Sequence, residues 1–137
     1  MLMLLLSFTS SYAWSERLVV VVNKQNPLSS ITQRQLTDMY MGRTQYFSDG
    51  RAALKIDAPG NSEMRQYFYD FLVNMTLPEV NAYWARLMFS GRATPPMQVS
   101  NEHDVMQLVT SNPNAIGYVP EQDVNADVKV IFSIQVD

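Results

Sequence analysis

Two loops of this sequence carry side chains suited to binding a small anion. The first is the run from Asp57 to Ser62 (DAPGNS), which separates a short apolar segment from a helical pattern. The start of a helix offers free backbone N–H groups and a partial positive charge, and both favour an anion. Asn61 and Ser62 lie at that start, and Arg65 follows one turn inside the helix. Asn61, Ser62 and Arg65 are therefore the candidate residues of an anion site, although the spacing by itself favours a simple helix N-cap at Asn61 or Ser62, which is the commonest use of such residues.

The second loop runs from Asn23 to Ser30 (NKQNPLSS) and follows the first apolar segment in the same way. Ser29 and Ser30 could add hydroxyl groups, and we expect this loop to lie beside the first. Capping is again an alternative, because Ser30 and Gln33 have the spacing of a capping box. Glu63 would oppose an anion bound near Ser62, whereas its carboxylate suits the start of a helix without any ligand.

Composition argues against most other kinds of site. The chain of 137 residues has no cysteine and a single histidine, His103, which leaves no thiol nucleophile and no His-rich metal site. It also lacks a Gly-rich phosphate loop and the HExxH and GxSxG motifs. The net charge is -3 and the ten basic residues are scattered, which argues against nucleic acid as a partner. We therefore expect neither an enzyme nor a protein with a metal or cofactor.

The elements that must position these loops alternate between strands and helices. Apolar runs predict strands over 17–22, 53–56, 116–119 and 128–134, the last with Val128, Val130, Phe132 and Ile134 on one face. Apolar spacing predicts helices after Ser30, after the 57–62 loop, from 76 to 90 and from 102 to 111, with a loop over 92–100. Such alternation predicts one α/β domain, a single three-layer lobe with a mainly parallel sheet and helices on both faces.

Gly42 and Gly91 are the expected stops of the first and third helices, and Thr76 with Glu79 has the spacing of a capping box. The expected apolar stripe of the second helix is Met64, Tyr67, Phe68, Phe71 and Leu72.

Residues 1–13 at the N-terminus are predicted to be a signal peptide. Its apolar run, MLMLLLSF, is too short to span a membrane. Ser11 and Ala13 form the small-x-small pattern of a cleavage site before Trp14. This predicts export to the periplasm and a single domain over residues 14–137.

Four segments together resemble a known family. They are VVVN at 20–23, ITQRQLTDMYMGRTQYF at 31–47, SEMRQYF at 62–68 and NAIGYV at 114–119. In order and spacing they resemble the phosphate-binding periplasmic proteins of ABC importers, which have the type II solute-binding fold, and in particular the short, single-lobe members. The resemblance implies one of the two lobes of a full-length member. Where the family reads Arg-x-Asp-x-Ser-Gly-Thr, residues 58–64 read APGNSEM and keep only Ser62.

The resemblance implies a phosphate ABC transporter substrate-binding-like protein. Its ligand would be phosphate or another small oxyanion, and its partner an ABC permease or another envelope protein. Binding is expected to be weak, because Ala58 replaces the arginine of the family and Glu63 adds a carboxylate. The alternative is a lobe that has lost its ligand and uses the uncovered surface for protein interaction or as a homodimer.

Overall fold

The structure is a computed structural model and describes residues 17–135. The predicted signal peptide and its boundary at Trp14 lie outside the described residues. The elements along the chain are β1 (Leu18–Asn23), α1 (Gln33–Tyr40), β2 (Leu54–Asp57), α2 (Glu63–Val73), α3 (Leu77–Phe89), β3 (Met97–Gln98), α4 (His103–Ser111), β4 (Ala115–Pro120), a 3-10 turn (Glu121–Asp123) and β5 (Val128–Ile134). The two-residue strand β3 lies in a stretch that the sequence predicts to be a loop.

The five strands form one sheet in the order β3-β2-β4-β1-β5. β2 pairs in parallel with β3 and with β4, whereas β1 pairs antiparallel with β4 and with β5. Four strands therefore share one direction and β1 alone opposes them. The predicted α/β fold with a mainly parallel sheet is confirmed. The antiparallel direction of β1 was not predicted, because its continuous apolar run is typical of a strand in a parallel sheet.

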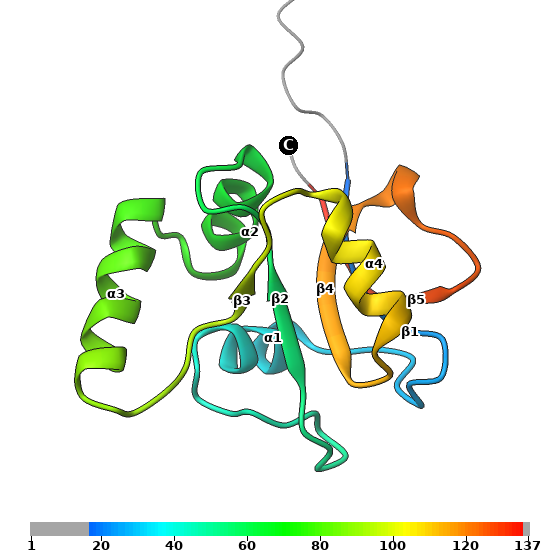
Figure 1. Cartoon of the computed structure of the whole chain (residues 1–137), viewed down its shortest axis with the longest axis horizontal. Helices are drawn as coiled ribbons and strands as arrows, with labels where there is room; N and C mark the ends of the chain where they lie inside the picture. The colour runs from blue at the N-terminus through cyan, green and yellow to red at the C-terminus, as the bar shows by residue number, and fades with distance from the viewer. Residues whose placement is uncertain (1–16, 136–137) are drawn as a thin grey trace, which may run out of the picture.

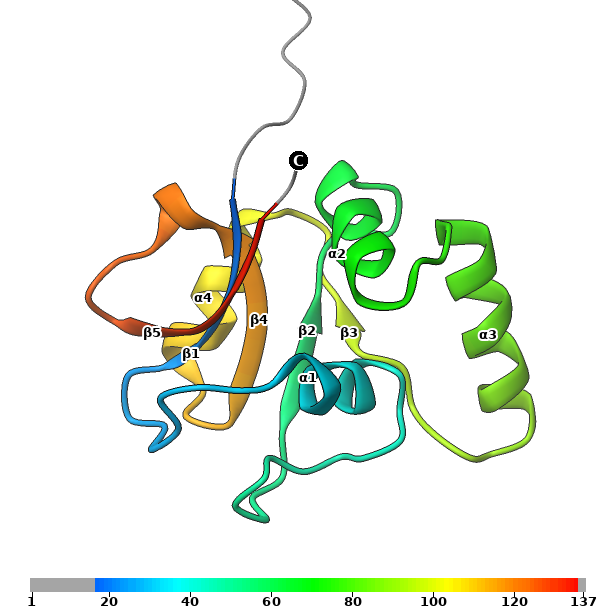
Figure 2. The ribbon, with the colours of Figure 1, turned by 180° about the vertical axis from the view of Figure 1, so that it is seen from behind.

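Helices cover both faces of this sheet, so the lobe has three layers. α4 lies on one face, and α1 and α2 lie on the other (Figures 1 and 2). Successive side chains of a strand point to opposite faces. Val20 and Val22 accordingly join the core under α1 and α2, while Val19 and Val21 join the core under α4. This explains why β1 is a run of valines with every residue buried.

The capping residues at the helix ends agree with the predictions except at the start of α1. α1 is capped by Thr32 and Gln35, whose side chains and backbone N–H groups bond reciprocally at 3.0 and 3.1 Å, and not by Ser30 and Gln33. Thr76 is the N-cap of α3 and accepts a hydrogen bond from the Glu79 N–H, which is one of the two bonds of the predicted capping box. Gly42 follows the end of α1 with φ +76°, which is the expected glycine stop.

The last strand departs from its predicted alternation. β1 pairs Val20 with Phe132 but Val21 with Val130, so Ile131 is the extra residue of a bulge. Ile131 is buried, whereas Val130 is 40% exposed. A bulge shifts the following side chains to the other face, and the predicted stripe from Val128 to Ile134 is therefore interrupted.

Candidate anion-binding site

The predicted site lies where β2 ends and α2 begins. Ser62 is the N-cap of α2, and its side-chain oxygen accepts a hydrogen bond from the Arg65 N–H at 3.2 Å. The capping interpretation of Ser62 is therefore confirmed. The N–H groups of Glu63 and Met64 belong to the first turn, where a helix provides no internal acceptor. Asn61 is exposed beside them.

Ser29 and Ser30 do not join this site. β1 runs against β4, so that Leu18 pairs with Pro120 and Val22 with Ile116. The loop after β1 therefore lies at the amino ends of β2 and β4, whereas the start of α2 lies beyond the carboxyl end of β2 (Figure 1). The expectation that the two loops lie side by side is wrong, because it assumed that β1 runs parallel to β2.

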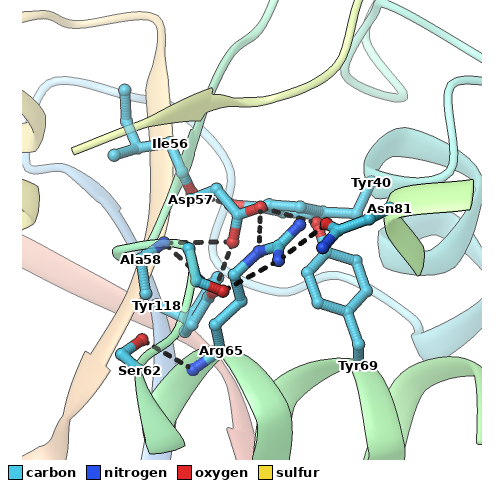
Figure 3. A network of polar contacts seen from close by, with 10 residues as sticks. Tyr40, Ile56, Asp57, Ala58, Ser62, Arg65, Tyr69, Asn81 and Tyr118 are labelled. Carbon is cyan, nitrogen blue, oxygen red and sulfur yellow. Dashed lines mark hydrogen bonds and ion pairs between the residues drawn. The ribbon is translucent and has the colours of Figure 1, made fainter. Parts of the chain in front are cut away.

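Arg65 is close to Ser62 but points under the loop instead of outward. The residue is 2% exposed, and its Nε donates to Asp57 Oδ2 at 3.1 Å (Figure 3). Its Nη1 donates to the Gly60 carbonyl at 3.1 Å and to Asn81 Oδ1 at 3.2 Å. The guanidinium also lies over the ring of Tyr69, 5.2 Å from the ring centroid. This charge holds α2, α3 and the 57–62 loop together.

The Asp57 carboxylate is the centre of this cluster (Figure 3). Its Oδ2 accepts from Arg65 and from the Tyr69 hydroxyl at 2.9 Å, and its Oδ1 accepts from the Ala58 N–H at 3.0 Å and from the Tyr118 hydroxyl. Burial raises the pKa of Asp57, and the bonds from Tyr118, Arg65 and Tyr69 oppose that rise. Burial, together with the charge of Asp57, raises the pKa of both tyrosines well above 10.0. Both phenols therefore stay protonated and act as donors.

Sequence reasoning missed most of this cluster. The predicted apolar stripe of α2 was Met64, Tyr67, Phe68, Phe71 and Leu72, whereas the buried residues are Met64, Arg65, Phe68, Tyr69 and Leu72. The helix is therefore rotated so that two polar residues enter the core. Arg65 and Tyr69 are four residues apart, which places them on one face. This spacing, together with an aspartate at the end of a predicted strand, was the signal available.

Lys55 is a second buried charge, two residues before Asp57. It is 8% exposed, and its ammonium donates to the Met39 carbonyl at 3.0 Å, near the end of α1. Burial lowers the pKa of Lys55 because it disfavours the charged form. The folded state therefore binds fewer protons than the unfolded state between this lowered pKa and the ordinary lysine value of about 10.4.

We expect Lys55→Met to expose this linkage. The free energy of unfolding of wild type should increase relative to that of Lys55→Met as pH rises from about 7 to about 10. Only wild type has a buried lysine that loses its proton, and therefore its unfavourable buried charge, over this range. Urea unfolding of both proteins across this range measures the difference, in which the titration of the remaining groups cancels. A difference that stays constant with pH would contradict the prediction.

Two features are absent from the described part of the chain. Within residues 17–135, no group of three or more His, Asp or Glu side chains could hold a metal ion. The helices of this same part of the chain are all too short or too polar to cross a membrane.

Comparison with known proteins gives a match in fold. No protein-family model matches the sequence, and no curated protein matches it. Among solved structures, a Clostridium perfringens protein described as a phosphate ABC transporter substrate-binding protein with bound phosphate matches with TM-score 0.67 and 18% identity. An ABC-type phosphate transport receptor from Vibrio cholerae matches with TM-score 0.67 and 20% identity, and PstS from Borrelia burgdorferi with 0.64 and 15%.

These matches cover 85% of this chain but only 45%, 45% and 46% of the three solved chains. The chain thus spans less than half the length of these proteins. The resemblance seen in the sequence is confirmed as a likeness of fold: this chain has the fold of one lobe of a phosphate-type periplasmic binding protein.

Proposed function

We propose that this chain is a periplasmic solute-binding lobe that binds phosphate or another small oxyanion at the start of α2. The observation that carries the proposal is the position of that helix start, which lies beyond the carboxyl end of β2. In open α/β sheets, ligands bind at this end of the strands. The solved proteins that share the fold are described as phosphate-binding or phosphate-transport proteins.

The donors at this position are neutral. Ser62 Oγ accepts the Arg65 N–H, so its own proton is free for an anion, and the N–H groups of Glu63 and Met64 lie beside it. The charge of Arg65 is already compensated by Asp57. Neutral hydrogen bonds contribute less than charge-assisted ones. The proposed binding is therefore weak and depends on the helix start.

A second candidate function is protein interaction, as a single lobe or a homodimer that no longer needs a ligand. The observation in its favour is the buried Asp57–Arg65 pair, because this pair satisfies the interior of the loop without any bound anion. An ABC permease or another envelope protein is the proposed partner under either candidate, and export through a signal peptide would bring the chain to it.

Thermal unfolding in different salts tests the first candidate. Phosphate or sulfate at about 10 mM should raise the melting temperature more than chloride at equal ionic strength, and a larger shift in phosphate than in sulfate would identify phosphate as the preferred oxyanion. A ligand present at about 100 times its Kd stabilises a protein by about 2.7 kcal/mol, which is a shift of several degrees for a domain of this size. Equal shifts in all three salts would contradict oxyanion binding and favour the second candidate.

A matched pair of cap variants locates the site. Ser62→Ala should abolish the phosphate-specific shift and also cost about 1 kcal/mol, because it removes both an N-cap and the proposed hydroxyl donor. Thr76→Ala removes the N-cap of α3 by the same chemistry, and it should keep the phosphate shift. Loss of the shift in both variants, or retention in both, would contradict a site at Ser62.

A further inference from the structure

The donors around Asp57 form an anion-binding set in their own right. One guanidinium N–H, two phenol hydroxyls and one backbone N–H converge on a single carboxylate. We propose that Asp57 is a built-in ligand, whose carboxylate occupies an anion subsite made by Arg65, Tyr69, Tyr118 and the Ala58 N–H and closes it to free anions. This subsite lies beneath the 57–62 loop, and the proposal is independent of phosphate binding at the exposed start of α2.

The first argument is that the set is complete. An ionised carboxylate has about four acceptor positions, and each oxygen of Asp57 receives two hydrogen bonds. The tyrosines supply only donors toward Asp57, because both phenols stay protonated. A single positive charge, that of Arg65, balances the single negative charge. These are the features expected of a pocket that holds one small monovalent anion.

The second argument is that the surrounding fold holds these four donors in position around the carboxylate. The donors come from three elements, with Tyr118 on β4, Arg65 and Tyr69 on α2, and the Ala58 N–H directly after β2 (Figure 3). Arg65 is 2% exposed, and both tyrosines are 0% exposed. The ring of Tyr118 stacks on Phe68 with centroids 3.8 Å apart, which fixes the position of its hydroxyl. When the carboxylate is removed, Arg65 keeps its bonds to the Gly60 carbonyl and to Asn81 Oδ1. We therefore expect the donors to remain in place around a vacancy of the size of a carboxylate group.

Asp57→Ala opens this subsite, and formate has the size and charge of the missing group. The variant should melt below wild type, since it leaves a buried guanidinium without its counter-charge. Formate should raise the melting temperature of Asp57→Ala several degrees more than chloride at equal ionic strength. Wild type should show no such preference, because its own carboxylate fills the subsite. Phosphate is larger than the vacancy and should act on Asp57→Ala no more than it acts on wild type.

Two variants control this experiment. Val109→Ala removes side-chain volume from the core under α4, away from any of these donors, and it should not respond to formate more than to chloride. Asp57→Asn fills the space with an amide, and it should also lack a formate-specific shift. Adding Tyr118→Phe to Asp57→Ala removes one donor, and it should reduce the formate-specific shift.

The outcomes separate a built-in ligand from an ordinary structural ion pair. Equal shifts of Asp57→Ala in formate and in chloride, or an equal formate shift in Val109→Ala, would overturn the proposal. If Asp57→Ala does not fold alone, refolding is compared in formate and in chloride. Recovery of folded protein in formate only supports the proposal, and no recovery in either salt overturns it. Phosphate binding is tested by a separate comparison, that of wild type with Ser62→Ala. Either proposal can therefore fail without the other.

Discussion

Replacing Arg65 by methionine is expected to lower the free energy of unfolding by about 3–5 kcal/mol. Methionine keeps most of the length of the side chain but leaves the carboxylate of Asp57, which is 1% exposed, without its cation. The Gly60 carbonyl and Asn81 Oδ1 lose their donor in the same step. Urea unfolding at neutral pH measures the loss.

An exposed ion pair provides the control for this prediction. Arg43 Nη1 lies 3.0 Å from Asp38 Oδ1, and the side chain of Arg43 is 61% exposed. Exposed pairs contribute about 0–1 kcal/mol, so Arg43→Met should change stability by no more than this. A loss in Arg65→Met as small as that in Arg43→Met would contradict a central role for the buried pair.

Two further measurements identify the lost charge as the cause. Adding Asp57→Asn to Arg65→Met removes the unpaired carboxylate and should recover part of the loss, which a double-mutant cycle quantifies. Without Arg65, the pKa of Asp57 should rise further, because the opposing cation is gone. A folded-state pKa above the unfolded value favours folding at low pH, so the gap to wild type should narrow as pH falls from about 7 to about 5. A gap that widens over this range would contradict the assignment.

The sequence predicts this fold well because its signals are local. Apolar periodicity placed four helices and four of the five strands, and glycines marked the ends of α1 and α3. The direction of β1 is not a local property. A run of buried valines satisfies a central strand of either direction, and only its pairing with Tyr118 and its neighbours on β4 decides the direction. The misplacement of Ser29 and Ser30 follows from that single ambiguity.

The arrangement of side chains at the start of α2 was predicted only in part, for a similar reason. Ser62 and Arg65 were identified from the helix start, and both lie there. The sequence does not show which way a long side chain turns. Arg65 was expected to take part in the anion site near Ser62, yet it turns inward and bonds to Asp57 and Asn81 beneath the loop. Such a contact joins residues 8 and 16 positions away, and no short-range pattern encodes it.

Gly42→Ala is expected to lower the free energy of unfolding by about 2–4 kcal/mol, at a position outside the Asp57 cluster. Gly42 has φ +76°, where an L side chain is strained, and an added Cβ would lie 2.6 Å from Trp84 Cη2. Trp84 is one of the two buried residues of α3, and the neighbouring Tyr83 hydroxyl donates to the Met41 carbonyl at 2.5 Å. Displacing Trp84 therefore loosens the attachment of α3 to the end of α1.

Gly91→Ala separates the clash from the backbone strain. Gly91 also follows a helix end, with φ +69°, but nothing lies within 4 Å of an added Cβ. It should cost only the strain of about 1–2 kcal/mol. Equal losses in the two variants would contradict the steric argument. Adding Trp84→Phe to Gly42→Ala shortens the opposing ring and should recover part of the difference. α3 also carries Asn81, so displacing α3 in Gly42→Ala should weaken the contact between Asn81 and Arg65. The double variant of Gly42→Ala and Asn81→Ala should therefore lose less stability than the sum of the two single losses.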